Sequence, residues 1–268
     1  MRPKQGLLMH CVTPQSAGWQ YLHFEVLSFE TSDKYVSQTL GNEVLLVFLS
    51  GSARVEVADE VFVISGRSSV FDGLPFALYL PPNTTYTIIP SSQLEVAWGG
   101  APALGKFGVK LLEPPDFRTE LRGGANVTRH ISHIISPDVW GEKLFVFEVY
   151  TPSGNWSGFP PHRHDGRDGS SYLEETYYFK ISPKNGFGSI RLYTKDTPLD
   201  EFKLVQHNDL VLVKEGYHPT NAAPGSNLYF LNFLVGHGTD YIVSNDPDFD
   251  WVKDDWTGEA LELPLREK

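Results

Sequence analysis

Two histidines separated by one residue are the part of this sequence best suited to chemistry. His162 and His164 lie in the segment 154-GNWSGFPPHRHDGRDGSSYLEETYYFKI-181. On an extended strand, residues two apart project from the same face, so both imidazoles can bind one ion. The pair alone is weak evidence, because His-x-His also occurs by chance in surface loops. The acidic strand that follows, and His218 in the tight turn Glu-Gly-Tyr-His-Pro, favour a shared metal site.

Two adjacent glutamates compete for the remaining ligand position. Successive side chains of a strand point to opposite faces, so only one of them can face the histidines. Glu175 is in phase with the apolar side chains of Tyr177, Phe179 and Ile181. Glu174 is in phase with a more polar set, Thr176, Tyr178 and Lys180. We therefore predict that Glu175 binds the metal and that Glu174 is a solvated strand residue.

The predicted ligand set of His162, His164, Glu175 and His218 limits the choice of ion. Three neutral imidazoles and one carboxylate suit a borderline divalent ion, which could be Zn²⁺, Mn²⁺, Fe²⁺, Co²⁺ or Ni²⁺. Calcium and magnesium would require more oxygen ligands. The alternative is a closed site that only stabilises the fold. Structural zinc usually relies on cysteine, however, and the single cysteine is Cys11, in a terminal segment.

Strands are the elements that must position these residues. Short runs of Val, Ile, Leu, Phe and Tyr, bounded by Gly, Pro, Asn or Asp, recur along the chain, and helical periodicity is nearly absent. This pattern predicts an all-β protein of many short strands. The runs are 43–57, 60–66, 77–82, 144–152, 175–182, 188–194, 209–216 and 228–236.

An internal repeat divides the chain into two halves. The segments 43-EVLLVFLS-50 and 175-ETYYFKIS-182 each open with Glu, run apolar and reach Ser before a glycine-containing turn. The connecting segment 100–130 is rich in Gly and Pro and is typical of a crossover. We predict two tandem β-barrels with a boundary near residue 120: residues 1–120 without a metal site and residues 121–268 with the metal and active site.

The first half departs from the metal pattern. Glu43 is interpreted as the counterpart of Glu175, but no histidine precedes it, and Tyr86 takes roughly the place of His218. A three-histidine site cannot form there. The first barrel is therefore predicted to be structural, covering sheet edges and burying apolar surface against the second barrel.

The order His-x-His, Glu and then a distant His resembles the metal motif of cupins, which implies a bicupin of two jelly-roll barrels. The motifs Gly-Asn-Trp-Ser-Gly-Phe-Pro-Pro-His-Arg-His-Asp, Tyr-Leu-Glu-Glu-Thr-Tyr-Tyr and Lys-Glu-Gly-Tyr-His-Pro resemble, over nearly the whole chain, the 5-deoxy-glucuronate isomerase family of bacterial inositol catabolism. The 4-deoxy-5-ketouronate isomerases of pectin breakdown share the architecture and ligand types. Their loop between His-x-His and Glu is shorter, which favours the inositol branch.

The resemblance implies a metal-dependent aldose-ketose isomerisation of 5-deoxy-D-glucuronate to 5-dehydro-2-deoxy-D-gluconate. A metal with two open positions could chelate the carbonyl and the neighbouring hydroxyl and stabilise an enediolate. A base must also lie within hydrogen-bond reach. Glu175 is poorly suited while it coordinates the ion, so the alternatives are a metal-bound hydroxide, Glu174 if it faces inward, or Tyr177.

The substrate would be a small anionic sugar acid, whereas the protein carries a formal net charge of -11. Attraction must then be local, through a basic side chain inside the barrel. The candidates are Lys180, Arg191 and Arg129, with Arg191 preferred. Arg163 lies between two inward histidines and is expected to point outward.

Composition restricts the partners. The acidic charge and the lack of Lys/Arg runs argue against nucleic acid, and no stretch approaches the ~20 apolar residues of a membrane span. One cysteine and no secretory signal favour a cytoplasmic protein. Strand exchange among cupins is compatible with a homo-oligomer. Two other functions stay open: a metal-dependent dioxygenase, which would consume oxygen, and a non-catalytic sugar-binding cupin, which would bind the uronate without turnover.

Overall fold

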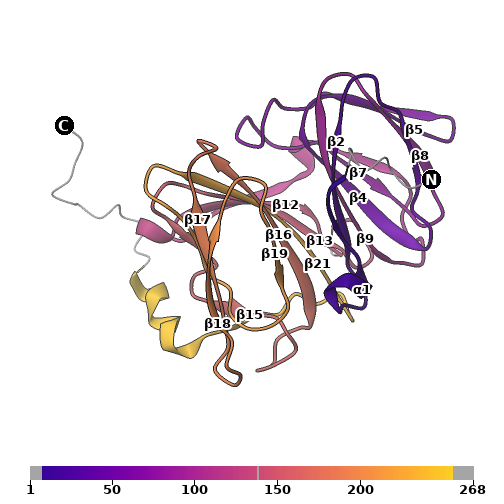
Figure 1. Cartoon of the computed structure of the whole chain (residues 1–268). Helices are drawn as coiled ribbons and strands as arrows, with labels where there is room; N and C mark the ends of the chain where they lie inside the picture. Colours follow the sequence, from indigo (N-terminus) through magenta and orange to yellow (C-terminus); the bar gives the residue numbers. More distant parts are fainter. Residues whose placement is uncertain (1–7, 138, 256–268) are drawn as a thin grey trace.

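The computed structural model describes residues 8–137 and 139–255 of the chain. Two β-barrels lie side by side, the first formed by the N-terminal half and the second by the C-terminal half (Figure 1). The chain passes from one to the other between Leu112, where the last strand of the first barrel ends, and Arg118, where the first strand of the second begins. The predicted boundary at residue 120 lies a few residues later, inside that strand.

The first barrel consists of two antiparallel sheets. Their strand orders are β1-β2-β9-β4-β7-β10 and β3-β8-β5-β6. A short helix, α1 (Pro14–Ala17), lies between the first two strands. The strands are β1 (Leu8–Val12), β2 (His23–Phe29), β3 (Tyr35–Gln38), β4 (Asn42–Ser50), β5 (Ala53–Val57), β6 (Glu60–Ile64), β7 (Ala77–Leu80), β8 (Thr85–Pro90), β9 (Leu94–Pro102) and β10 (Lys110–Leu112).

The second barrel repeats this plan. Its sheets have the orders β11-β12-β13-β21-β16-β19 and β14-β20-β17-β18, and β15 pairs with β22. The strands are β11 (Arg118–Arg122), β12 (Arg129–Ile135), β13 (Phe145–Thr151), β14 (Trp156–Ser157), β15 (His162–Arg163), β16 (Leu173–Ser182), β17 (Gly188–Tyr193), β18 (Asp200–Val205), β19 (Leu210–Val213), β20 (Thr220–Ala222), β21 (Asn227–Gly236) and β22 (Ser244–Asn245). The 3₁₀ helices are η1 (Pro114–Asp116), η2 (Ala125–Val127) and η3 (Pro247–Asp255).

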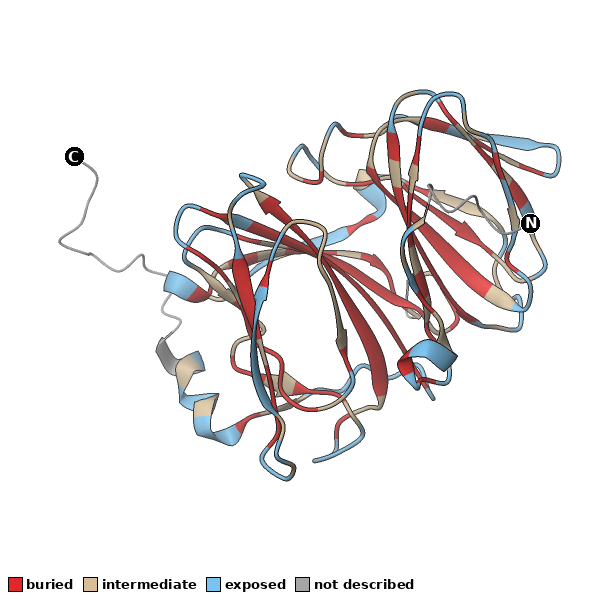
Figure 2. Ribbon diagram, in the orientation of Figure 1, coloured by how far each residue is buried: buried red, intermediate tan, exposed pale blue. Residues whose placement is uncertain are grey.

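Each barrel has its own apolar interior. Along β4, alternate residues beginning at Val44 face the interior of the first barrel, and along β16 alternate residues beginning at Tyr177 face the interior of the second. The opposite faces of both strands are also buried, as the red strands at the centre of Figure 2 show. This double burial explains why the central strands are continuously apolar rather than alternating with polar residues.

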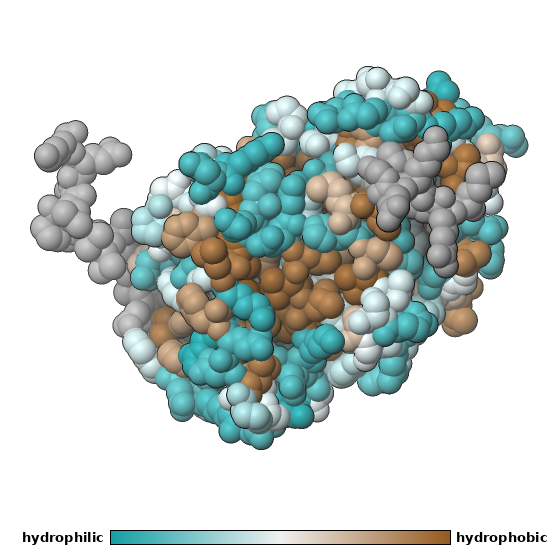
Figure 3. Space-filling view, in the orientation of Figure 1, coloured by the Kyte–Doolittle hydropathy of each residue, from teal (hydrophilic) through white to brown (hydrophobic). Residues whose placement is uncertain are grey.

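The surface of the molecule is mostly hydrophilic in the view of Figure 3. Apolar side chains gather at the middle of this face, over the part of the second barrel where β16 and β19 are labelled in Figure 1. Among the described residues, no helix has the length and apolar character that crossing a bilayer requires.

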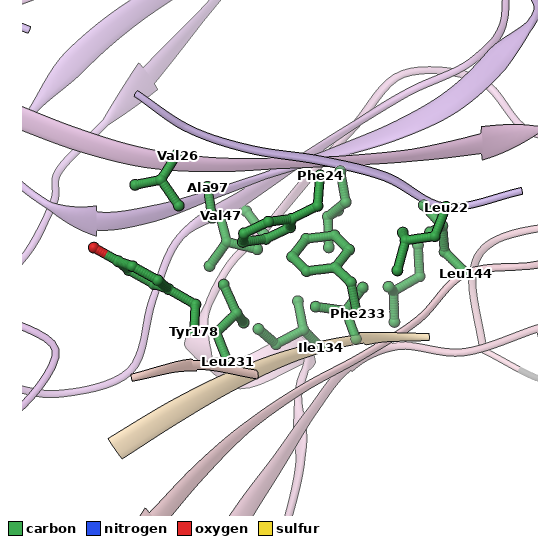
Figure 4. Close-up of a cluster of buried hydrophobic side chains, with 14 of the residues drawn as sticks. Leu22, Phe24, Val26, Val47, Ala97, Ile134, Leu144, Tyr178, Leu231 and Phe233 are labelled. Carbon is green, nitrogen blue, oxygen red and sulfur yellow. The ribbon is translucent and has the colours of Figure 1, made fainter. Parts of the chain in front are cut away.

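The two barrels share a third core, formed where their six-stranded sheets face each other. Figure 4 shows side chains of the first barrel, among them Phe24, opposite side chains of the second, among them Phe233. The two rings lie 5.5 Å apart, centroid to centroid. Gly99 of β9 permits this approach, because a Cβ atom there would lie 2.1 Å from the Phe233 ring. The apolar faces of the two barrels are therefore in close contact at this point.

A reciprocal pair of carboxylates also joins the barrels. Glu43 of β4 accepts hydrogen bonds from the backbone N–H groups of residues 142–144, just before β13. Glu174 of β16 accepts the corresponding bonds from residues 20–22, just before β2. The prediction that Glu174 is solvated is therefore wrong, since the residue is 1% exposed.

This reciprocity also corrects the predicted register of the repeat. Because Glu43 and Glu174 make equivalent contacts from equivalent strands, Glu43 is the counterpart of Glu174 and not of Glu175. Val44 then occupies the place of Glu175 and contributes to the apolar interior of the first barrel. The first barrel thus lacks the carboxylate as well as the histidines of the predicted metal site.

Candidate metal centre and adjoining cavity

Three imidazoles converge inside the second barrel. His162 belongs to β15, His164 follows it directly, and His218 lies in the turn before β20. One ring nitrogen from each lies within 4.8 Å of the others, a spacing that one metal ion can bridge. Glu175 of β16 reaches the same point, with its Oε2 atom 2.8 Å from Nε2 of His164 and 3.3 Å from Nε2 of His218. The structure therefore brings together the four residues that the sequence predicted as ligands.

The outer hydrogen bonds of two histidines determine which nitrogen faces this point. Nδ1 of His164 lies 3.0 Å from the Leu173 carbonyl oxygen, and Nδ1 of His218 lies 3.1 Å from that of Gly216. A carbonyl oxygen can only accept, so each Nδ1 carries the hydrogen and each Nε2 presents a lone pair. Such second contacts are typical of metal-binding histidines.

The arrangement at the centre is one that a cation would satisfy. The Nε2 lone pairs of His164 and His218 point toward a carboxylate oxygen that is itself an acceptor. Nε2 of His218 is buried and has no hydrogen-bond partner among the described residues. A buried polar atom without a partner is costly, and a divalent ion would bind all of these acceptors at once.

The protonation of the histidines favours the same interpretation. Burial lowers the pKa of His162 and of His218 to about 3, so both rings are neutral near pH 7. For His164, burial acts in the same direction, but the charge of Glu175 and the hydrogen bond to it raise the pKa above its ordinary value. A metal ion and a proton therefore compete for the space between His164 and Glu175.

A buried ion pair fixes the two loops that carry the histidines. Arg163 donates to Asp165, with Nη2 and Oδ2 2.7 Å apart, and the same Asp165 oxygen accepts from the backbone N–H of Gly216 at 2.8 Å. Arg163 thus points away from the imidazoles, as predicted, but into this ion pair rather than into solvent, since it is 2% exposed. Its guanidinium also lies over the ring of Tyr217.

A cavity of about 250 Å³ adjoins the metal centre. His162 and Glu175 form part of its wall, so the centre is open to a small molecule from this side. The remaining wall combines an apolar part with a polar part. The apolar and aromatic lining residues are Ile131, Phe145, Phe147, Val149, Tyr177, Phe230 and Tyr241. Pockets that combine apolar walls with a few convergent polar groups are typical of small-molecule sites.

The other polar part of the wall is basic. Arg118, Arg122, Arg129 and His133 line the cavity, and Glu175 is the one acid among the described lining residues. Arg129 is buried and donates to the carbonyl oxygens of Val127 and Phe159. Burial, followed by the nearby charge of Arg122, lowers the pKa of Arg129 to about 10, so it remains a cation at neutral pH.

Of the predicted substrate-binding residues, only Arg129 reaches the cavity. Lys180 lies on the opposite face of β16 and binds Glu95 of the first barrel, with Nζ and Oε2 2.7 Å apart. Arg191 lies on the outside of the second barrel, where it pairs with Asp200. The predictions for Lys180 and Arg191 are therefore wrong, because strand alternation turns both side chains away from the cavity.

The predicted catalytic residues also divide by strand face. Tyr177 lines the cavity beside Glu175, and its ring lies 5.9 Å from that of His218. Burial raises the pKa of Tyr177 well above its ordinary value. Glu174 points to the first barrel and cannot reach a molecule in the cavity.

Sequence reasoning missed Arg118, Arg122 and His133. The segment that contains both arginines was interpreted as a crossover because of the glycines and prolines around it. The alternation in 118-RTELR-122 is a usable signal, since it places Arg118, Glu120 and Arg122 on one face of an extended strand. Asn232 of β21, which also lines the cavity, carries no comparable signal in the sequence.

Comparisons with known proteins show the family to which the chain is similar. Residues 1–252 match the model of the KduI/IolB family. The chain is 40% identical over 245 residues to a 5-deoxy-glucuronate isomerase of Geobacillus thermodenitrificans, an alignment that covers 90% of this chain and 89% of the relative. It is 33% identical over 250 residues to the protein of that name in Bacillus subtilis, covering 91% and 92% of the two chains.

Solved structures show the same architecture. The crystal structure of an IolB-like protein from Salmonella typhimurium has a TM-score of 0.88 and 32% identity, and the match covers 91% of this chain and 95% of that one. An oxalate decarboxylase from Lactobacillus farciminis has a TM-score of 0.62 at 12% identity, covering 88% and 82%, which shows a likeness of fold alone. The predicted all-β fold of two tandem barrels is thus confirmed.

Proposed function

The chain belongs to the KduI/IolB family, and from this membership we propose that it isomerises 5-deoxy-D-glucuronate to 5-dehydro-2-deoxy-D-gluconate. One observation carries the proposal: the convergence of His162, His164, His218 and Glu175 opens on a cavity of small-molecule size with arginines in its wall. The relatives named above bear the name of this activity. The reaction would belong to myo-inositol catabolism in the cytoplasm.

The ligand set would hold one divalent ion, which Zn²⁺, Mn²⁺, Fe²⁺, Co²⁺ and Ni²⁺ all fit by ligand type. When bound, the ion supplies a Lewis acid that polarises the substrate carbonyl and its neighbouring hydroxyl. His162 and Glu175 line the cavity directly, whereas His164 and His218 lie behind them. The face of the centre toward the cavity is therefore where the substrate would bind.

Glu175 is our candidate for moving the proton between the two reacting carbons. Both of its contacts with imidazoles are made by the same oxygen, Oε2. This leaves Oε1 as the oxygen that would accept a proton from the substrate and return it to the adjacent carbon. The hydroxyl proton would pass to the former carbonyl oxygen, which completes the exchange of aldehyde and alcohol. From the sequence, Glu175 is expected to be poorly suited as a base while it coordinates the ion. Its two oxygens could divide the tasks, with one binding the ion and the other transferring the proton.

Tyr177 would stabilise the intermediate. A phenol is protonated at neutral pH, so its hydroxyl can donate a hydrogen bond to an oxygen that gains negative charge. Tyr177 lies two residues from Glu175 on the same face of β16, and Asn232 lines the cavity with it. Surrounding aromatic residues exclude water, which strengthens such a bond.

The test is turnover of 5-deoxy-D-glucuronate by the purified protein, followed by NMR. We expect conversion to the keto acid by the protein as purified or after addition of a divalent ion, and loss of conversion after treatment with a chelator. 4-Deoxy-5-ketouronate would be tested beside it, and oxygen consumption would be recorded. Faster turnover of the ketouronate, or uptake of oxygen, would replace the proposal by the corresponding alternative. If the protein binds the uronate but does not convert it with any of the divalent ions, the alternative of a non-catalytic sugar-binding protein would be supported.

A further inference from the structure

The edge strand β11 places arginines along one wall of the cavity. Arg118, Glu120 and Arg122 share a face of β11, and their cross-strand partners on β12 are His133, Ile131 and Arg129. All of these except Glu120 line the cavity. Among the described residues, the corresponding sheet of the first barrel begins with β1, the counterpart of β12, and shows no strand at the position of β11. Within the described part of the chain, the basic wall thus occurs in the barrel that contains the candidate metal ligands.

Arg122 and Arg129 are directly opposite each other across the two strands. Like charges in such a position repel, and the repulsion is relieved when an anion binds between them. Glu120 compensates for part of this charge, because it pairs with Arg122 and with His133. Among the described lining residues, three arginines still outnumber the one acid, Glu175.

Local structure holds Arg129 in place for this purpose. The guanidinium is anchored by Nη1 to the carbonyl of Val127 at 2.9 Å and by Nη2 to that of Phe159 at 3.1 Å. Gly123 lies close beside it, and a Cβ atom there would be 2.9 Å from Nη1. These two bonds fix the orientation of the guanidinium at the cavity wall. A preorganised guanidinium of this kind suits the planar geometry of a carboxylate.

We propose that Arg122 and Arg129 bind the carboxylate of the substrate, with Arg118 adding positive charge beside them, while the opposite end of the molecule reaches the His162–Glu175 side of the cavity. This inference rests on the proposed function for the identity of the acid. The apolar wall between the two polar ends, which includes Phe147 and Val149, would lie along the carbon chain. The arginines would thus select a sugar acid over the corresponding neutral sugar.

The experiment compares Arg122→Gln, Arg129→Gln and, as a matched control, Arg191→Gln. Arg122 has a side chain that is 45% exposed, so its variant is expected to fold even if the Arg129 variant does not. Arg191 is an arginine on the outer wall that pairs with Asp200. The ligands are 5-deoxy-D-glucuronate and the analogue in which a hydroxymethyl group replaces the carboxylate. Turnover is measured by NMR and binding by calorimetry.

We expect KM and Kd for the uronate to rise roughly 10- to 100-fold in Arg122→Gln, with kcat within about 3-fold of wild type, because charged hydrogen bonds to the substrate are lost. Binding of the neutral analogue should not change, and Arg191→Gln should match wild type. A merely structural role of Arg122 would weaken both ligands alike and would overturn the inference, as would an unchanged KM for the uronate.

The outcomes separate this inference from the proposed function. Turnover of the uronate with unchanged constants in the Arg122 variant would overturn the inference alone. Arg122-dependent binding of the uronate without turnover would support the carboxylate site and overturn the isomerase proposal. Neither binding nor turnover by the metal-loaded wild type would overturn both.

Discussion

Glu174 and Glu175 are neighbours in the chain but interact with different barrels. Glu175 faces the imidazoles, and Glu174 accepts three backbone hydrogen bonds from the segment before β2. The difference follows from the alternation of side chains along β16. Two adjacent glutamates therefore face opposite sides of one strand, and substitution can separate their roles.

The metal content of a variant should depend on whether the substituted side chain faces the histidine cluster. We expect His162→Ala and His218→Ala to lose bound divalent ion on dialysis, because each removes one ligand. Glu174→Gln should retain the ion, although the protein becomes less stable. Elemental analysis of the purified variants gives the answer. Equal metal loss in all three would contradict the assignment of Glu174 to the other face.

Glu175→Gln should lower kcat more than Tyr177→Phe does. Removal of the group that transfers the proton is expected to lower kcat by at least about 100-fold, in the range typical of general acid–base catalysis. Loss of the Tyr177 hydroxyl should lower kcat by roughly 10- to 100-fold and leave the metal bound. Steady-state kinetics with parallel metal analysis separates a catalytic defect from a binding defect. Wild-type kcat in Glu175→Gln with full metal would exclude Glu175 as the base.

Among the elements, the short pair β15 and β22 positions His162 of the candidate metal centre. His162 is opposite Asn245, and the backbone N–H of Asp246 donates to the Pro161 carbonyl at 2.7 Å. The Asp246 side chain is 1% exposed, forms an ion pair with Lys195 and accepts from the Tyr193 hydroxyl at 2.7 Å. This segment therefore holds the strand of His162 against β17.

Asp246→Ala should weaken the attachment of the His162 strand to β17. We expect about 1–3 kcal/mol lower stability, because a buried hydroxyl loses its acceptor. Metal affinity should fall by roughly 10-fold, as when groups behind a metal ligand are removed. Asp248→Ala is the control, since the Asp248 side chain is 72% exposed and contacts the same lysine. Denaturant titration and competition with a metal indicator measure the two effects, and equal behaviour of both variants would refute the role of Asp246.

The elements also explain which features the sequence could predict. The convergence of His162, His164, Glu175 and His218 could be predicted, because side-chain type and strand period are local properties. The register of the repeat was predicted one residue out, because Glu43 resembles Glu174 and Glu175 equally until the partner of each is known. Arg118 and Arg122 could not be placed at the cavity for a similar reason: β11 becomes a strand only by pairing with β12, and this contact is tertiary.

The whole molecule has an uneven distribution of charge. Its formal net charge is -11, yet three arginines and one glutamate line the cavity beside the metal centre. An acidic exterior repels anions at long range, so capture of an anionic substrate depends on these short-range cations. KM for the uronate should consequently respond less steeply to salt than it would in a protein with a basic exterior.

Glu43→Gln and Glu174→Gln should each destabilise both barrels together. Each variant leaves buried backbone N–H groups of the other barrel with a poorer hydrogen-bond acceptor. We expect this to lower the free energy of unfolding by about 2–4 kcal/mol and Tm by roughly 5–10 °C. Calorimetry should still show one transition, because the shared core couples the barrels. Glu60→Gln, on the exposed strand β6, is the control. Two separate transitions in either variant would show that the barrels unfold independently.

The exchange of equivalent contacts between Glu43 and Glu174 is the pattern found in two-fold symmetric dimers, where residue i of one copy binds residue j of the other and the reverse. The two barrels thus have the arrangement of a pseudo-two-fold dimer within one polypeptide. Cleavage of the connection between Leu112 and Arg118 should leave two fragments that reassemble through this interface when mixed. Neither fragment should fold alone, since each would expose an apolar sheet and a carboxylate without its donors.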